Sequence, residues 1–248
     1  MKNTIEDEYY MRIHALHKLY KQRLSQSTRP FLARGGRITR CVNCMLLPYL
    51  CICPFKKTVQ TNSAFLLLMY DDEILKPSNT GRLVADIVPD TFAYIWSRTE
   101  ANKEMLALLK DPQLQPIVIF PAEYSQPERV ICAEKNSIGN KKPLFILLDG
   151  SWAQAKKMFR KSPYLDSLPV LSFSPENISR YLVRKAVKDN QLATAEVAAL
   201  ALEYIGEQDN AAQLELLFEV FKENYLLGKE RKQLPEDAAF YKLKAGND

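Results

Sequence analysis

The 248-residue sequence predicts an α/β fold in which a mainly parallel sheet carries helices on both faces. From about residue 60 onward, short and continuously apolar strands alternate with helical segments. One of these strands, residues 144–148, runs directly into Asp149, and a helix follows within three residues. Ligands of open α/β sheets bind beyond the carboxyl ends of the strands, so we expect the functional site near Asp149.

Composition and charge limit the class of protein. Apolar residues make up 47% of the chain, as in ordinary globular proteins. Lys and Arg outnumber Asp and Glu by 34 to 29, and the excess is clustered, which favours an anionic partner. The N-terminal segment is too acidic for a signal peptide, and no apolar run approaches the roughly 20 residues that span a bilayer. We therefore expect a cytoplasmic protein without a membrane partner.

An amphipathic helix is predicted at the start of the chain, ending near Ser25. Its apolar side chains recur at spacings of three and four residues: Ile5, Tyr9, Ile13, Leu16, Tyr20 and Leu24. Residues 28–37 are basic and interrupted by glycines, which is typical of a loop or arm. We assign this helix and arm to residues 1–36.

Four of the five cysteines lie within 13 residues, in the order Cys41-x-x-Cys44 and Cys51-x-Cys53. Cytosolic thiols rarely form disulfides, and four clustered thiolates are the usual ligands of a structural zinc ion. Four buried free thiols or an iron–sulfur cluster are the alternatives. We assign residues 37–60 to a small zinc-binding module that holds the arm in place.

The larger part of the chain, residues 61–228, is predicted to form the main α/β domain, followed by a charged, loosely ordered tail at 229–248. Predicted strands cover residues 64–69, 91–96, 117–120, 144–148 and 169–173, and predicted helices cover 80–87, 102–110, 151–161, 195–205 and 211–227.

The turn after the strand at 144–148 reads Asp149-Gly150-Ser151-Trp152. Ser151 with Gln154 forms a capping-box pattern, and the helix N-terminus that it caps favours a negatively charged ligand group. Asp149 is then placed to act as a base or to hold a cationic group, although Asp-Gly is also a common structural turn. Trp152 is either a packing residue or a stacking platform for a base.

Three further segments are expected at the same edge of the sheet. In the first, Asn79 or Thr80 can cap a helix, Gly81 permits close approach to the backbone, and Arg82 can pair with a carboxylate or phosphate. The others contribute Phe120 with Pro121, and Thr194 with Glu196. Each has an ordinary capping or packing explanation, and the prediction of a site depends on their convergence. The two histidines, His14 and His17, lie far from this edge in sequence, which disfavours hydrolytic catalysis.

These motifs, in this order along the chain, closely resemble the DTW-domain family of tRNA-uridine aminocarboxypropyltransferases. The similarity runs from about residue 28 to residue 227 and includes Thr194-Ala195-Glu196-Val197. Several stretches look most like the bacterial enzyme that modifies a uridine of the tRNA variable loop, at position 47. Two features depart from the family pattern. Ser151 stands where the Asp-x-Thr-Trp motif has threonine, and Tyr70-Asp71-Asp72-Glu73 replaces the frequent His-Pro-x-Glu segment.

The resemblance implies a fold related to the knotted SPOUT methyltransferases, and S-adenosylmethionine as the donor of a 3-amino-3-carboxypropyl group. Asp149 is then expected to be the general base for the uridine ring nitrogen, or to orient that base. The residues expected to hold the donor are Asn79, Thr80, Gly81, Arg82, Phe120, Pro121, Ser151, Trp152, Thr194 and Glu196.

The resemblance also implies tRNA as the partner, and we expect a monomer. The phosphate contacts are expected from basic residues of the arm and of the helix after Ser151: Arg29, Arg34, Arg37, Arg40, Lys156, Lys157, Arg160 and Lys161. Two alternative functions stay open, a methyltransferase that uses the same donor on RNA, and a zinc-dependent RNA-binding protein without catalytic activity.

Overall fold

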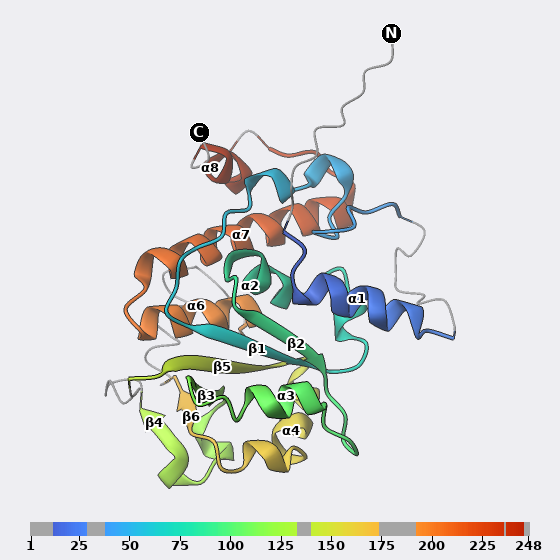
Figure 1. Cartoon of the computed structure of the whole chain (residues 1–248). Helices are drawn as coiled ribbons and strands as arrows, with labels where there is room; N and C mark the ends of the chain where they lie inside the picture. Colours follow the sequence, from blue (N-terminus) through green and yellow to red (C-terminus); the bar gives the residue numbers. More distant parts are fainter. Residues whose placement is uncertain (1–11, 29–37, 133–139, 174–191, 236, 246–248) are drawn as a thin grey trace.

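A computed structural model describes residues 12–28, 38–132, 140–173, 192–235 and 237–245. Within them lies a six-stranded parallel sheet of order β2-β1-β5-β3-β6-β4 (Figure 1). The strands are β1 (Ala64–Met69), β2 (Thr91–Ile95), β3 (Leu114–Ile119), β4 (Val130–Cys132), β5 (Lys142–Asp149) and β6 (Val170–Ser172). The α/β class and the parallel sheet are therefore confirmed.

Helices cover both faces of the sheet, as the sequence predicts (Figure 1). Successive strand side chains point to opposite faces, so Phe65, Leu67 and Met69 join one core while Leu66 and Leu68 join the other. The first core contains residues of α1 (Ala15–Ser25), α2 (Gly81–Ile87), α6 (Thr194–Tyr204), α7 (Gln208–Glu230) and α8 (Ala239–Ala245). The second contains residues of α3 (Lys103–Leu108) and α4 (Trp152–Arg160).

The parallel register brings the carboxyl ends of the central strands to one edge. Met69, the last residue of β1, lies opposite Asp149, the last residue of β5. The Tyr70 amide then donates a 2.9 Å hydrogen bond to the Asp149 carbonyl, so the two chains leave the sheet together. The loop before α2 and the loop before α4 therefore start side by side.

The cysteine segment packs against α7 and is part of the first core. Leu50 and Ile52 are fully buried, and the buried Asn224 of α7 donates a 2.9 Å hydrogen bond to the Leu50 carbonyl. A side chain at Gly228 would meet Leu47 at 3.3 Å, which shows how closely the helix backbone approaches this segment.

Helix α1 is shorter than predicted, because the described chain is helical only from Ala15. Ile13, expected on the buried stripe, is 61% exposed. Arg12 instead donates to carbonyls at the end of α2 and beyond, including those of Val88 at 3.4 Å and Pro89 at 3.1 Å, which holds this segment away from a helical path. Ile5 and Tyr9 lie outside the described residues.

Two other expectations need correction. The segment after Gly228 is not loosely ordered where it is described, since α7 continues to Glu230 and Phe240 of α8 packs edge-on against Phe55, with ring centroids 5.0 Å apart. Strand β4 is missing from the prediction because only three residues of it pair, at the border of the sheet. In the part of the chain that the structure describes, no helix is both long and apolar enough to cross a membrane.

Candidate functional site

Asp149 is the centre of a polar cluster at the carboxyl edge of the sheet. Its Oδ2 accepts a 2.8 Å hydrogen bond from the Asn79 side-chain amide, and its Oδ1 accepts a 2.7 Å hydrogen bond from the Thr194 hydroxyl. These donors come from the loop after β1 and from the first residue of α6. The structure thus brings together three segments that the sequence predicts to converge.

Gly81 and Thr80 allow this close assembly. A side chain at Gly81 would lie 2.5 Å from the Asp149 Oδ2, so a residue without a Cβ is required here. The hydroxyl of Thr80 accepts a 3.4 Å hydrogen bond from the Ala195 amide and joins the start of α2 to the start of α6. Glu196 caps α6 by accepting from the Ala193 amide at 2.8 Å, which leaves the Thr194 hydroxyl for Asp149.

Among the described residues, the hydrogen-bond donors to the Asp149 carboxyl group are neutral. Burial raises its pKa to about 6, and the hydrogen bonds from Asn79 and Thr194 offset only part of that effect. The nearby Glu73 raises the pKa further, whereas Lys76, ion-paired with Glu73, lowers it. A carboxyl group with this pKa is largely ionised at neutral pH and accepts a proton more readily than an ordinary aspartate.

Asp149 and Arg82 are both deeply buried at this edge. Asp149 lies where the functional site is expected, and it is only 3% exposed. Arg82 was expected to meet an anionic ligand, yet it is 2% exposed and its Nη1 donates a 3.3 Å hydrogen bond to the Asn43 carbonyl in the cysteine segment. The guanidinium therefore reaches from α2 to the cysteine segment.

Helix α4 begins beside this cluster as predicted. The Ser151 amide donates a 2.7 Å hydrogen bond to the Gln154 Oε1, which is the backbone half of the expected capping box. Trp152 is 40% exposed and stacks on the buried Phe120, with ring centroids 5.5 Å apart. Phe120 is therefore a packing residue under Trp152, and the neighbouring Pro121 is half-buried.

The predicted RNA contacts are divided among three places. Lys156 is half-buried and Lys157, Arg160 and Lys161 are exposed, all on α4 or at its end. Arg40 lies beside the cysteines, where its Nη1 donates a 3.0 Å hydrogen bond to the Met45 carbonyl. Arg29, Arg34 and Arg37 lie outside the described residues.

The four clustered cysteines form the arrangement that their spacing predicts. Their sulfur atoms all lie within 4.8 Å of one another, with the Cys41 and Cys53 sulfurs 3.6 Å apart and the Cys44 and Cys51 sulfurs 3.7 Å apart. Zinc–sulfur bonds of about 2.3 Å in a tetrahedron give sulfur separations of about 3.8 Å, so these residues fit a zinc ion. Met45, with φ of 62°, makes the tight turn after the first pair.

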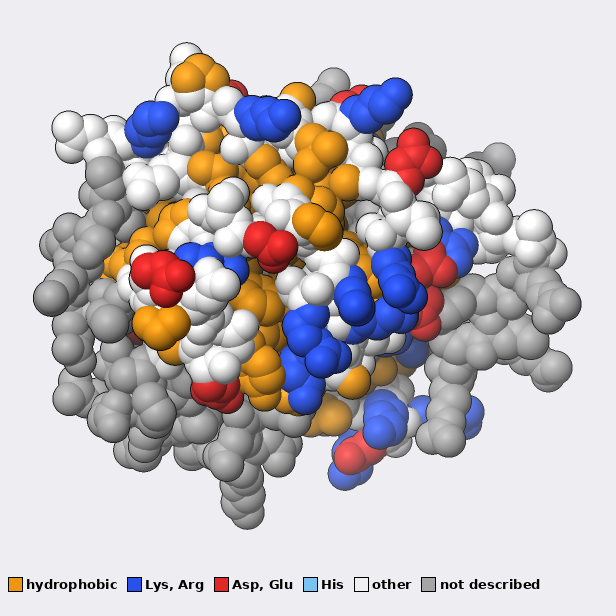
Figure 2. All heavy atoms as spheres, turned by 90° about the horizontal axis from the view of Figure 1, so that it is seen from below, with side chains coloured by type: hydrophobic (Ala, Val, Ile, Leu, Met, Phe, Trp, Pro, Cys, Tyr) orange, Lys and Arg blue, Asp and Glu red, His pale blue; other side chains and the backbone are white. Residues whose placement is uncertain are grey.

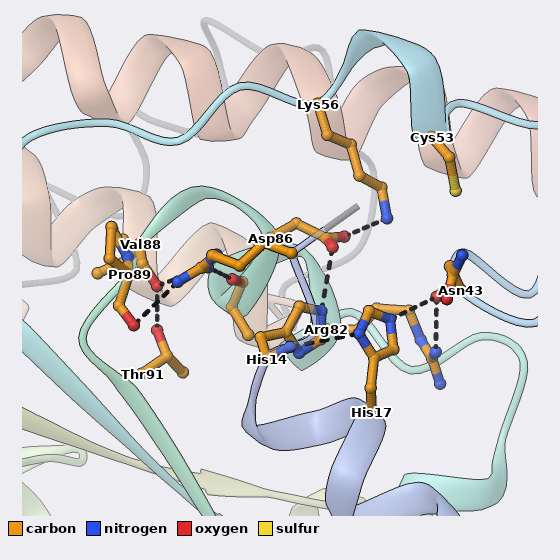
Figure 3. A network of polar contacts seen from close by, with 12 residues as sticks. His14, His17, Asn43, Cys53, Lys56, Arg82, Asp86, Val88, Pro89 and Thr91 are labelled. Atoms are coloured by element: carbon orange, nitrogen blue, oxygen red, sulfur yellow. Dashed lines mark hydrogen bonds and ion pairs between the residues drawn. The ribbon is translucent and has the colours of Figure 1, made fainter. Parts of the chain in front are cut away.

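A second polar cluster, which the sequence analysis does not predict, lies between the cysteines and α2 (Figure 3). Buried Asp86 accepts from the His14 Nε2 at 3.1 Å and pairs with the Lys56 ammonium at 2.6 Å. Burial alone would raise the pKa of Asp86, but Lys56 and His14 outweigh it and lower the pKa to about 2. One feature of the sequence could have indicated this cluster: Arg82 and Asp86 are charged residues spaced four apart in an otherwise apolar predicted helix.

His14, His17 and Asp86 also lie close enough to hold a metal ion, but their contacts disfavour one. The His17 Nε2 donates to the Asn43 carbonyl at 3.3 Å, and its Nδ1 accepts from the His14 amide at 3.5 Å. Both ring nitrogens of His17 are thus engaged. Burial, helped by the neighbouring His14, lowers the pKa of His17 to about 4, so the ring is neutral.

Comparisons with known proteins agree with the order of these motifs. A family model of the DTW domain matches residues 38–226. A curated protein of Macaca fascicularis, tRNA-uridine aminocarboxypropyltransferase 2, is 24% identical over 195 residues. The aligned part is 73% of this chain and 61% of the relative, so the chain spans about three fifths of the relative's length. No solved structure matches the chain. The family match covers most of the chain, and the chain belongs to the DTW-domain family.

Proposed function

We propose that this protein transfers the 3-amino-3-carboxypropyl group of S-adenosylmethionine to the ring nitrogen of a tRNA uridine in the variable loop. Family membership and the name of the curated relative support a tRNA-modifying transferase. The observation that carries the proposal is the hydrogen-bonded set of Asn79, Asp149 and Thr194 at the carboxyl edge of the sheet. Ligands of parallel sheets bind at this edge.

The polar atoms of this edge fit a donor that carries positive charge. Asn79 is 2% exposed, and its Oδ1 has no hydrogen-bond partner among the described residues. A buried acceptor without a partner is costly unless a ligand supplies a donor, and the ammonium group of S-adenosylmethionine would do so. The N-terminus of α4, beside Ser151, favours the carboxylate of the same molecule. The contact of Arg82 that the structure describes, to the Asn43 carbonyl, does not support the expectation that Arg82 holds the donor.

Bound S-adenosylmethionine supplies a methylene carbon that its sulfonium activates toward attack. We propose that the Thr194 hydroxyl accepts the proton of the uridine ring nitrogen and passes its own proton to the Asp149 Oδ1, along the 2.7 Å hydrogen bond. The nitrogen then forms a bond to the methylene carbon, while the carbon–sulfur electron pair leaves with the sulfur as neutral methylthioadenosine. Because Asp149 must be ionised, activity rises with pH through about 6.

The basic residues of α4 and of the cysteine segment are proposed to contact tRNA phosphates. Lys156, Lys157 and Arg160 lie on α4, next to the proposed site, and Lys161 follows at its end. Phosphate contacts release bound counterions, so we expect the affinity for tRNA to fall steeply with salt concentration. We also propose that the protein acts in the cytoplasm, where such a tRNA substrate occurs.

We propose that the four clustered cysteines hold a structural zinc ion. The fit of the four sulfur atoms to a tetrahedron supports zinc, and a site with four protein ligands leaves no position for a substrate. Metal analysis of the purified protein should find one zinc per chain, and Cys51→Ser should lose it. One iron–sulfur cluster per chain, visible by its absorption, would contradict the proposal.

The relationship to the SPOUT fold is also a proposal, because it comes from the family resemblance. The described part supports it with a parallel sheet that has helices on both faces. We further propose that residues 61–228 form the catalytic domain around this sheet. The connection between β6 and α6, on which a knot would depend, includes residues 174–191, which lie outside the described ones.

The test is a transfer assay with zinc-loaded protein, S-adenosylmethionine and unmodified tRNA, followed by mass spectrometry of the nucleosides. We expect 3-(3-amino-3-carboxypropyl)uridine and an equal amount of methylthioadenosine. Asp149→Asn should bind the donor in calorimetry yet lose transfer, by about 100-fold or more. Thr194→Ser keeps the hydroxyl and should retain activity, whereas Thr194→Val should not.

Three results would contradict the proposal. Full activity of Asp149→Asn would exclude the carboxylate as proton acceptor. A methylated nucleoside would indicate a methyltransferase that uses the same donor. Absence of donor binding in the unaltered protein would favour an RNA-binding protein without catalytic activity.

A further inference from the structure

Two large aromatic side chains are exposed next to each other beside the start of α4. Trp152 is 40% exposed and Tyr124 is 37% exposed, and their ring centroids lie 5.7 Å apart in an edge-on arrangement. Both also contact the buried Phe120, at 5.5 Å. We name Phe120, Tyr124 and Trp152 the aromatic platform. Contiguous exposed apolar side chains rimmed by polar residues are typical of interaction sites.

Trp152 is held in a fixed orientation from below. Phe159, Phe120 and Trp152 form a column of nearly parallel rings, with centroid distances of 4.4 Å and 5.5 Å and interplanar angles of 11° and 17°. Arg129 closes the Phe159 end of the column at 5.7 Å, and hydrogen bonds to two backbone carbonyls fix Arg129 itself. The column therefore has one closed end and one exposed end, and the exposed end is the indole.

The side chain of Lys156 lies over the exposed end of this column. The Lys156 ammonium lies 5.6 Å from the Trp152 ring centroid and 5.8 Å from that of Tyr124. Figure 2 views the molecule from the side on which Figure 1 shows α4, and on this face Lys and Arg side chains gather beside exposed apolar side chains. The platform thus combines flat apolar rings with positive charge.

A second aromatic stack nearby shows what a purely structural arrangement looks like. Tyr70 and Trp96 stack with centroids 5.7 Å apart, but Trp96 is only 8% exposed and its Nε1 donates a 2.8 Å hydrogen bond to the Ser162 hydroxyl. Lys157 donates a 3.1 Å hydrogen bond to the Tyr70 hydroxyl above this stack. This inner stack is closed by hydrogen bonds, whereas the indole of Trp152 makes no side-chain hydrogen bond that the described residues reveal.

We propose that the aromatic platform stacks an unpaired base of the RNA substrate, with Lys156 moving from the ring face to the adjoining phosphate. The inference rests on the part of the proposed function that makes RNA the partner. Stacking on an aromatic ring combined with a basic surface is how proteins hold single-stranded nucleic acid. The adenine of the donor is the other base available, but the donor is itself cationic, and Lys156 would repel it. Trp152 is thereby assigned to the RNA and not to the donor.

Fluorescence tests the contact directly, because the chain has two tryptophans. In a Trp96→Phe variant, Trp152 is the single reporter. Unmodified tRNA should quench its emission, whereas heparin, which occupies the lysines without bases, should not. Equal quenching by heparin, quenching by S-adenosylmethionine alone, or unchanged emission in a tRNA complex detected by anisotropy would each overturn the proposal.

Affinity and kinetics provide the second measurement. Trp152→Ala should weaken tRNA binding about tenfold, as loss of one stacked base does, and Trp152→Tyr should restore most of it. Tyr241→Ala removes a similarly exposed ring, 46% exposed, from α8 at the other end of the molecule and is the matched control (Figure 1). Unchanged tRNA affinity in Trp152→Ala would overturn the inference.

Different experimental outcomes would contradict the proposed reaction and the proposed base-stacking site. If the unaltered protein modifies tRNA but Trp152→Ala keeps the KM for tRNA, the inference fails alone. If no modified nucleoside forms and tRNA still quenches Trp152, the proposed reaction fails and the base-stacking site stands.

Discussion

Asp86 and Asp149 are two carboxyl groups buried to a similar degree, at 7% and 3% exposure. Their pKa values are nevertheless shifted in opposite directions. Burial is the largest influence on both and acts to raise the pKa of each. Asp86 contacts a lysine ammonium and a histidine, which outweigh burial and lower its pKa to about 2. Asp149 contacts an amide and a hydroxyl. These neutral partners do not outweigh the effect of burial, so the pKa of Asp149 is raised to about 6. The charge of the partner, and not the depth of burial, decides the result.

The difference in pKa fits two different roles, a structural one for Asp86 and a proposed catalytic one for Asp149. Asp86 stays ionised at any pH at which the protein functions, and with Lys56 and His14 it ties α2 to the cysteine segment and α1 (Figure 3). Asp149, beside the other end of α2, has a pKa that suits a proton acceptor. Arg82 belongs to the same helix, and burial lowers its pKa overall, although the charges of both carboxylates raise that pKa. Helix α2 thus connects the cysteine segment to the proposed site.

The largest effect is expected from removing the cation beside Asp86. Lys56→Met leaves a buried carboxylate without its counter-charge, and the free energy of unfolding should fall by about 3 to 5 kcal/mol. Urea unfolding of the zinc-loaded protein and of the variant measures this difference in the free energy of unfolding. Lys18→Met removes an exposed lysine from α1 and is the control, with a change within about 0.5 kcal/mol.

A double variant checks the reason for that loss. Lys56→Met combined with Asp86→Asn removes the stranded charge together with its partner, so it should recover much of the stability lost in Lys56→Met. A double variant as unstable as the sum of the two single variants would indicate that packing, and not charge, holds this cluster.

The dependence of stability on pH should have opposite signs for the two carboxyl groups. The raised pKa of Asp149 means that the folded protein binds more protons than the unfolded chain between about pH 4 and pH 6, so its contribution to stability falls with rising pH. Relative to Asp149→Asn, the unaltered protein should lose about 3 kcal/mol across this window and then stay level. Urea unfolding of both proteins at each pH measures the difference.

Asp86 provides the opposing case. Its lowered pKa gives stability that is present above about pH 4 and lost as the pH falls toward 2. The advantage of the unaltered protein over Asp86→Asn should therefore shrink only in strong acid. Parallel pH profiles of the two variants would refute the contrast between the two carboxyl groups.

The smallest effect is expected from crowding Asp149. In Gly81→Ala the new Cβ would lie 2.5 Å from the Asp149 Oδ2 and 3.3 Å from the Asn79 Oδ1, so the carboxyl group must shift. We expect transfer to slow by about 10- to 100-fold, because a misplacement of about 1 Å has effects of this size. Gly206→Ala also replaces a glycine, one with φ of 84° and open space around it, and should reduce stability while leaving the transfer rate unchanged.

The sequence alone predicted the sheet because its strands are buried on both faces and are therefore continuous apolar runs. The predicted strand at 64–69 matches β1 residue for residue. It also suggested that the segments of Asn79, Asp149 and Thr194 converge, since parallel strands bring their carboxyl ends to one edge, but the contacts among these side chains come from the structure. The four cysteines were predictable for a similar reason, because their spacing within 13 residues leaves little freedom.

The direction and environment of single side chains were decided only by the tertiary structure. Arg82 and Asp86 lie in one short predicted helix, and only the fold brings Lys56 and His14, distant along the chain, to Asp86 in the core. Asp149 and Asp86 are the same residue type with the same burial, and a pKa depends on which charges lie within a few ångströms. That arrangement follows from the packing of α1, α2 and the cysteine segment, and local sequence patterns do not contain it.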